Sequence, residues 1–274
     1  MPAWNPHVDV VLVLGSVVAV FLIWARRHEA ETGETTPAHN RRLFLSGMAV
    51  LFAVSIWPVH DVAEHRWYMA HMVQHMSFTL VAAPLLVSGI PAWMWRRMLH
   101  PPVVQRTWRS VTRPVPALIV STTVLLFTHW PVIVDTSVQS EPLHFALHTV
   151  LLLSALIMWW PVFSPLPEMP PVAPPTQMIY LFALSLAPAV PASFLTFGHS
   201  PLYKVYETFP RMLGVSPLAD QLMAGLLMKI VGGLILWGYI AVIFFRWHDR
   251  EQNEGWDALA LHDVDAHVRA ELKR

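Results

Sequence analysis

The sequence contains no cysteine. This absence excludes disulfide bonds, thiolate metal ligands, cysteine nucleophiles and the C-x-x-C-H motif that attaches haem covalently. A transition-metal site in this chain would therefore have to use histidine, methionine or carboxylate ligands.

Charged residues are scarce, at 13% of the chain, whereas soluble domains carry about 25%. Hydrophobic residues make up 55%, so we expect most of the folded surface not to face water. The formal net charge is zero, which gives no bulk attraction to nucleic acid. The 13 Trp and 24 Pro fit a membrane protein, in which Trp anchors helices at the interface and Pro is tolerated within them.

Several enzyme motifs are also missing. The sequence has no P-loop, no G-x-G-x-x-G and no G-x-S-x-G. The segment from His60 to His65 is one residue longer than the zinc-protease motif H-x-x-E-H, and H-E-x-x-H is absent. These absences exclude a metalloprotease and favour a protein that is not an enzyme.

Long apolar stretches predict an all-α, polytopic transmembrane bundle. A span of the roughly 30 Å hydrocarbon core needs about 20 apolar residues. We identify about seven such stretches: Val8–Ala25, Leu43–Val59, Tyr68–Ile90, Val115–Val134, Leu143–Val162, Gln177–Phe197 and Pro217–Phe245. Residues 1–245 then form the membrane domain, and residues 246–274 form a polar tail.

The basic residues predict the orientation of these spans. Cytoplasmic loops are enriched in Lys and Arg, and in this chain the loops on the opposite side contain only Arg66, Lys204 and Arg211. The first stretch is followed by Arg26 and Arg27, a charge order opposite to that of a cleavable signal peptide. We therefore expect the N-terminus outside, the C-terminus in the cytoplasm, and a multi-pass protein of the bacterial inner (plasma) membrane. Ala92–Val111 is either an amphipathic stretch on the membrane surface or an ordinary basic loop.

On this topology, eight histidines lie toward the extracytoplasmic side, with His7 as a ninth. Two pairs, His71/His75 and His144/His148, have i, i+4 spacing. Residues with this spacing lie one turn apart on one helix face, so both imidazoles of a pair can reach one metal ion. The other candidate ligands are His60, His65, His129 and His199. The competing interpretation is that these histidines only make hydrogen bonds.

Further polar residues could support such ligands. A metal-bound imidazole usually donates its second N–H to a carboxylate, a carbonyl or water. We assign this supporting role to Asp61, Glu64, Asp220 and Gln221, and to Lys229 in the last span, which we expect to face protein. Met69, Met72 and Met76 flank the first pair. They are either core filler or soft ligands, which would point to copper.

Four segments together resemble one known family. They are His71-Met-Val-Gln-His75 continuing to Pro91; His144-x-x-x-His148 with Trp159-Trp-Pro161; Leu195-Thr-Phe197 with Pro201-Leu-Tyr203; and Leu218-Ala-Asp220-Gln221 continuing to Lys229. In these segments, and over roughly Leu43 to Phe245, the chain resembles the CtaG-like cytochrome c oxidase assembly factors. The resemblance implies a role in maturing a caa-type heme–copper oxidase, with oxidase subunits and membrane lipid as partners.

The resemblance also implies copper handling at the outer face, and the leading hypothesis is an assembly factor that binds copper through the histidines and delivers it. A haem protein with axial histidines is a second hypothesis. A structural oxidase-associated subunit without metal is a third. A copper transporter would need a polar path to the cytoplasm, and the inner halves of the predicted spans contain little polarity.

Overall fold

The computed structural model describes residues 7–210 and 214–271; for His65 and residues 254–271 only the backbone is described. Arg211, one of the loop charges used above, lies outside the described residues. Within the described part, the chain forms helices and connecting segments, with no strand. The predicted all-α class is confirmed.

Five helical units in the described part of the chain are long and apolar enough to cross a membrane. They are α1 (Val8–Thr32), α4–η1–α5 (Tyr68–Gly89), α10 (Glu141–Phe163), α11–α12 (Pro174–Phe197) and Pro217–Asn253 of α13. α7 and α8 (Pro102–Val111 and Pro114–Thr128) would make a sixth unit, but they are bent by 84° where they meet.

The composite units have internal breaks. α4 (Tyr68–Met76) passes through the π-helix η1 (Ser77–Ala82) into α5 (Ala83–Gly89). α11 (Pro174–Leu186) is followed by α12 (Ala189–Phe197), and α13 extends over Pro217–Glu271.

Two of the seven predicted spans differ from the structure. α2 (Ala38–Ser55) is not among the membrane-length units, and its first turns carry Asn40, Arg41 and Arg42, so its apolar part is short. The predicted span Val115–Val134 is divided, because α8 ends at Thr128 and α9 (Pro131–Val138) begins beyond His129. At about 1.5 Å per residue, α8 covers about 22 Å, less than the roughly 30 Å of a bilayer core.

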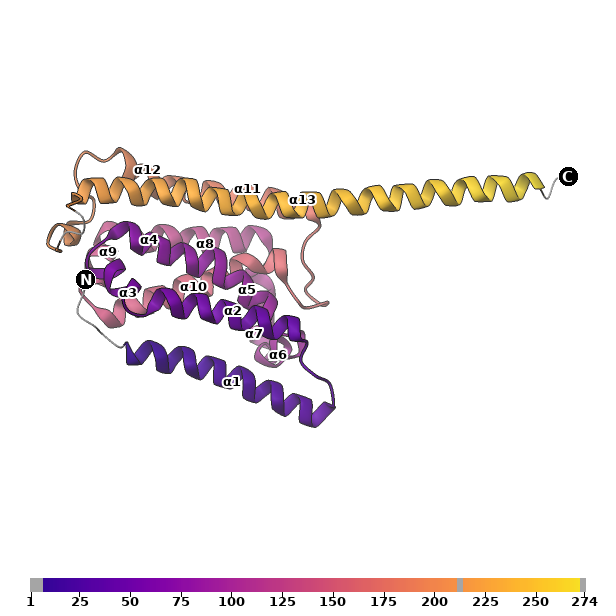
Figure 1. The fold of residues 1–274 in the computed structure, drawn as a ribbon, viewed down its shortest axis with the longest axis horizontal. Coiled ribbons are helices and arrows are strands. Elements are labelled where there is room, and N and C mark those ends of the chain that lie inside the picture. Colours follow the sequence, from indigo (N-terminus) through magenta and orange to yellow (C-terminus); the bar gives the residue numbers. More distant parts are fainter. Residues whose placement is uncertain (1–6, 211–213, 272–274) are drawn as a thin grey trace.

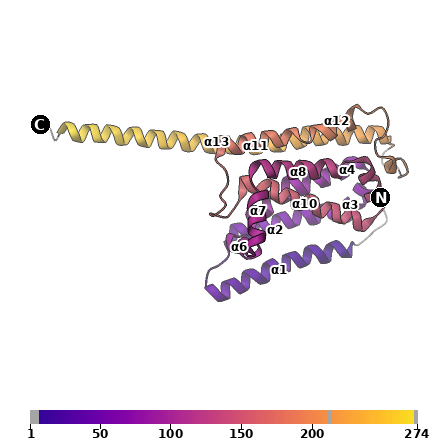
Figure 2. The same ribbon diagram turned by 180° about the vertical axis from the view of Figure 1, so that it is seen from behind.

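Figures 1 and 2 show the helices side by side in one bundle, with α1 at one edge and α11, α12 and α13 together at the opposite edge. α2, α4, α5, α8 and α10 lie between them. The short helices α3 (Val59–His65) and α9 lie at the end of the bundle where α1 begins, while α6 (Ala92–Met98) and α7 lie at the other end. α13 continues far beyond the bundle at that second end (Figure 1).

Small residues allow the closest helix contacts. A Cβ atom on Gly89 would collide with the backbone of Phe44, so glycine permits the approach of α5 to α2. A Cβ atom on Gly225 would lie 2.9 Å from Leu195 Cβ and 2.8 Å from Thr196 Oγ1. Close backbone approach between apolar helices is a common use of glycine in membrane bundles.

The π-helix is stabilised by side chains from two other helices. The indole N–H of Trp159 on α10 donates a hydrogen bond of 2.6 Å to the carbonyl of Thr79, and the hydroxyl of Tyr239 on α13 donates one of 3.3 Å to the carbonyl of Leu80. A π-turn departs from the usual helical pairing, and these two donors give its carbonyls additional hydrogen bonds from neighbouring helices.

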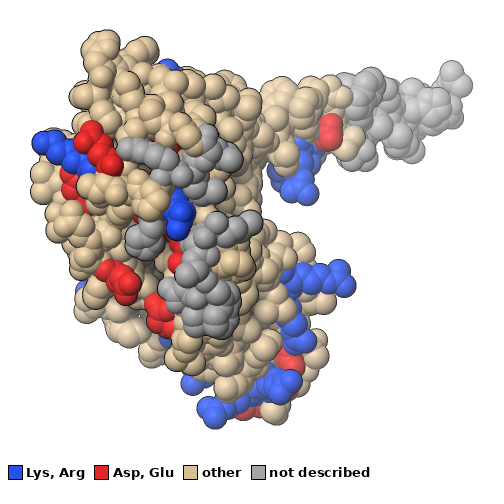
Figure 3. All heavy atoms as spheres, turned by 60° about the vertical axis from the view of Figure 1, so that its left-hand side comes forward, with Lys and Arg blue, Asp and Glu red and all other residues tan. Residues whose placement is uncertain are grey.

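The outer surface is mainly uncharged, as Figure 3 shows for one face. Large apolar side chains remain exposed along the helices, including Leu12 at 64%, Val115 at 65% and Leu234 at 66%. Such a surface is unfavourable in water and is the one that a helical bundle presents to lipid.

Candidate metal site

The first turn of α4 is held by a carboxylate from another helix. The backbone N–H groups of Tyr68 and Met69 donate hydrogen bonds of 2.8 and 2.9 Å to the two oxygens of Asp220, near the start of α13. The first N–H groups of a helix have no partner within it, and a carboxylate there also interacts favourably with the helix dipole. Asp220, predicted to support a ligand, thus fixes the helix that carries His71 and His75.

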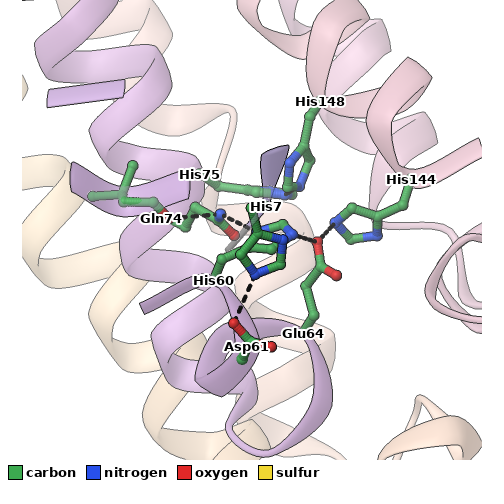
Figure 4. Close-up of polar contacts among 9 residues, drawn as sticks. His7, His60, Asp61, Glu64, Gln74, His75, His144 and His148 are labelled. Carbon is green, nitrogen blue, oxygen red and sulfur yellow. Dashed lines mark hydrogen bonds and ion pairs between the residues drawn. The ribbon is translucent and has the colours of Figure 1, made fainter. Parts of the chain in front are cut away.

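Three histidines from two helices converge beside this turn. His71 and His75 lie on α4, and His148 lies on α10. One ring nitrogen from each lies within 4.8 Å of the other two. The Nε2 atoms of His75 and His148 are 3.0 Å apart, and Figure 4 shows these two rings meeting between the helices. We call His71, His75 and His148 the histidine trio.

The trio could hold a metal ion. Nitrogen ligands about 2.0–2.1 Å from a tetrahedral ion are roughly 3.3 Å apart. The hydrogen-bond distance between His75 and His148 is 3.0 Å, and all three ring nitrogens lie within 4.8 Å of one another. The Nδ1 atoms of His71 and His75 are buried and have no hydrogen-bond partner among the described residues. A cavity of about 20 Å³ touches all three rings. This is the size of a single water or ion.

His144, the fourth histidine of the two predicted pairs, lies at the edge of the trio. Its ring centroid is 4.2 Å from that of His148 and 5.3 Å from that of His71. Its Nε2 atom lies 3.0 Å from Oε1 of Glu64, which is on α3. A carboxylate on one ring nitrogen fixes the orientation of the imidazole and makes the other nitrogen a better ligand.

Glu64 also joins His144 to a second chain of polar groups (Figure 4). His60 Nε2 lies 3.0 Å from the same Glu64 oxygen. The side-chain N–H₂ of Gln74 donates to the carbonyl of Val54 at 2.9 Å and to His60 Nδ1 at 3.1 Å. Because an amide nitrogen only donates, His60 accepts at Nδ1 and donates from Nε2 to Glu64.

The charge of Glu64 is stabilised despite burial. The side chain is buried, which by itself raises the pKa of a carboxyl, but contacts with His144 and His60 outweigh this and hold the pKa of Glu64 below its usual range. Burial lowers the pKa of His60, but the hydrogen bond and charge of Glu64 have the larger combined effect and raise it above its usual value. The site therefore contains a negative charge beside the histidines.

At the N-terminal end of the bundle, His7 pairs with Asp61. The His7 Nε2 atom lies 2.7 Å from Asp61 Oδ2, and the His7 ring packs edge-on against His60 at 4.6 Å. His7 adopts φ 40, an uncommon backbone conformation for a residue other than glycine. Asp61, predicted to support a metal ligand, thus binds a histidine outside the trio.

Of the remaining predicted residues, one lies beside the trio and one lies apart. His129 follows α8, lines the same small cavity as the trio and has its ring 5.8 Å from that of His75. His199 is exposed in the loop after α12. The side chain of His65 lies outside the described part. Gln221 bonds the N–H of Leu202 at 2.5 Å and the carbonyl of Leu195 at 3.2 Å, so it secures that loop.

The placement of Lys229 corrects the prediction. Lys229 was expected to face protein, but it is exposed on α13. Its neighbour Met228 takes the buried position on this turn. An exposed lysine can extend its ammonium group along a helix toward an interface, which removes the need for a partner inside the bundle.

Sequence reasoning missed Gln74 and gave His7 no role. Gln74 is fully buried and lies between the two histidines of α4, so a buried polar residue at that position could have been expected. The i, i+4 spacing of His60 and Glu64 was a further available signal.

Fold and site together define a class: an α-helical bundle with several membrane-length helices and a buried histidine cluster able to hold one metal ion. The family model described as "Cytochrome c oxidase caa3 assembly factor (Caa3_CtaG)" matches residues 19–250. The chain belongs to this family, as the resemblance of its motifs predicted. No curated protein and no solved structure matches it.

Proposed function

We propose that this protein is a multi-span membrane factor that binds copper at the histidine trio and delivers it to a subunit of a caa3-type oxidase. Membership of the family supports the role in oxidase assembly. The observation that supports metal binding is the convergence of three imidazole nitrogens within 4.8 Å from α4 and α10. The protein acts as a carrier and not as an enzyme.

The ligand types favour copper. Imidazole nitrogens suit copper, zinc and iron, whereas thioethers favour Cu(I). Met72, which is buried, lines the 20 Å³ cavity together with the trio. Copper is also a metal that a heme–copper oxidase must receive.

Three histidine ligands also suit delivery. Structural metal sites are usually closed by four protein ligands, whereas sites that exchange a ligand leave a position open. The open position of the trio would accept a donor atom from the receiving subunit. Glu64 would stabilise a cation that approaches from the His7–Asp61 end.

The proposal includes a topology with seven spans, the N-terminus outside and the C-terminus in the cytoplasm. In it, α2, and α8 together with α9, cross the membrane in addition to the five membrane-length units. The Lys and Arg distribution supports this orientation. It places the trio near the extracytoplasmic face of the bacterial cell membrane, where an oxidase subunit could receive the ion.

Metal analysis of the purified full-length protein tests the proposal. The variant H71A/H75A should bind one copper ion fewer per chain than the wild type, since it removes two ligands of the trio. H199A is the matched control, because His199 is exposed and lies outside the cluster; its copper content should not change. Equal copper binding by wild type and H71A/H75A would disprove the site assignment.

A further inference from the structure

A second, larger cavity lies next to the histidine trio. Its volume is about 80 Å³, and it is lined by residues of α4, η1, α8, α10, α11 and α13. His75 and Met72 line both this cavity and the smaller one, so the two spaces are neighbours. We call it the methionine cavity, after the four methionines in its wall: Met72, Met76, Met158 and Met228.

Irregular backbone borders the methionine cavity on two sides. Thr79 and Leu80 of the π-helix line it, as do Ala187 and Pro188 at the break between α11 and α12. In membrane proteins, broken helices are tolerated where they line a cavity, and they recur at binding sites. π-helical segments are likewise frequent at functional sites.

His129 has a ring nitrogen available as a ligand. Its side chain is buried and lines both the methionine cavity and the smaller one. Its Nδ1–H donates a hydrogen bond of 2.8 Å to the carbonyl of Leu125, so Nε2 carries the lone pair. That Nε2 atom is buried and has no hydrogen-bond partner among the described residues. A backbone carbonyl on Nδ1 with a free Nε2 is a common arrangement of metal-ligating histidines.

The methionines supply a soft partner set. The Sδ atom of Met76 lies 3.5 Å from where a Cβ atom on Gly232 would be, so this thioether faces α13. Met228 is one helical turn before Gly232 and shares its face. Methionine used as core filler closes gaps, whereas these side chains surround space that remains open.

We propose that the methionine cavity is a second metal station, selective for a soft monovalent ion. The ion is Cu(I), held by Nε2 of His129 and by the thioethers of Met76 and Met228. It passes there from the trio without a change of oxidation state, through ligands that both cavities share. The identity of the ion rests on the proposed copper function, but the station itself does not.

Titration of the full-length protein in detergent with two probe ions tests this station. Ag(I) is a soft monovalent ion that binds thioethers and imidazole, whereas Zn(II) prefers imidazole without thioether. We expect the wild type to bind two Ag(I) but one Zn(II). M76L/M228L conserves side-chain volume and should bind one Ag(I) and one Zn(II).

The control is M94L/M169L, since Met94 and Met169 are buried but do not line the cavity; it should still bind two Ag(I). H129A removes the proposed imidazole ligand and should also lose one Ag(I); because His129 borders the smaller cavity as well, its unchanged binding of one Zn(II) shows that the trio is intact. The station is disproved if the wild type binds only one Ag(I), or if both M76L/M228L and H129A retain two.

A third variant separates this inference from the proposed function. H71A/H148A changes two trio residues that do not line the methionine cavity. It should lose Zn(II) and one Ag(I) but retain the second Ag(I). If H71A/H148A retained Zn(II), the trio assignment alone would be refuted. If the second Ag(I) were lost only in M76L/M228L and H129A, the station would still be supported.

Discussion

Replacing Glu64 by glutamine removes the charge that contacts the histidines while keeping the size of the side chain. Oε1 of Glu64 lies 3.0 Å from both His60 and His144. A glutamine oxygen in the place of Oε1 can still accept from both histidines, but neither contact is then charge-assisted, so both weaken. A bound metal ion also loses a nearby negative charge.

The magnitude follows from comparable metal sites. Loss of a carboxylate that orients a metal-bound imidazole costs about 10–100-fold in affinity, or about 1.4–2.7 kcal/mol. Glu64 contacts His144 beside the trio and no trio histidine, so this cost is an upper limit. We expect E64Q to bind Zn(II) at the trio more weakly, by up to about 100-fold, with an unchanged stoichiometry of one. Competition against a chromophoric chelator measures both quantities.

D61N is the matched control, because Asp61 pairs with His7 and not with the trio or His144. Its affinity should change by less than that of E64Q. Equal Zn(II) affinities of E64Q and the wild type would show that Glu64 does not act on the ligands. If E64Q bound no Zn(II), Glu64 itself would be required for binding.

Three further predictions concern stability and protonation. D220N weakens two charge-assisted bonds to α4 and should lower the free energy of unfolding by about 1–3 kcal/mol. The control D249N, at an exposed position of α13, should not; equal denaturation midpoints of D220N and the wild type would refute the capping role. G89A should lower the free energy of unfolding by at least about 1–3 kcal/mol, because the added Cβ meets the backbone of Phe44. G233A, with open space around it, should be neutral or slightly stabilising; a G233A protein less stable than G89A would contradict the packing of α2 on α5. Because the pKa of His60 is raised in the folded protein, its contribution to stability is present below the unfolded pKa of about 6.5 and is lost as pH rises through the folded pKa. In E64Q, burial dominates, so NMR titration should show a lower His60 pKa than in the wild type; an unchanged pKa would refute the coupling to Glu64.

The features that sequence reasoning could predict are local in the chain. The pairing of His71 with His75, and of His144 with His148, depends only on helical periodicity. The two pairs were predicted to face a common site, and the structure brings three of the four residues within 4.8 Å, with His144 at the edge. The all-α class followed from long apolar stretches.

The features that sequence reasoning could not predict depend on distant segments. Asp220 caps a helix that begins 152 positions away in the chain, and nothing in its own neighbourhood indicates this partner. Lys229 turned out to be exposed because the rotation of α13 buries Met228 instead. The helix breaks at His129 and at Ala187–Pro188 did have a local signal, because Pro131 and Pro188 lie at them, although hydropathy continues across both.

The central claim, that the histidine trio holds copper, is tested most directly by X-ray absorption at the copper edge. The full-length protein would be loaded with half an equivalent of Cu(I), and wild type compared with H71A/H148A. The account predicts imidazole scattering from three nitrogen ligands at about 2 Å in the wild type, reduced to the single imidazole of His129 in the variant. A spectrum without imidazole scattering, or one identical in the two proteins, would contradict it.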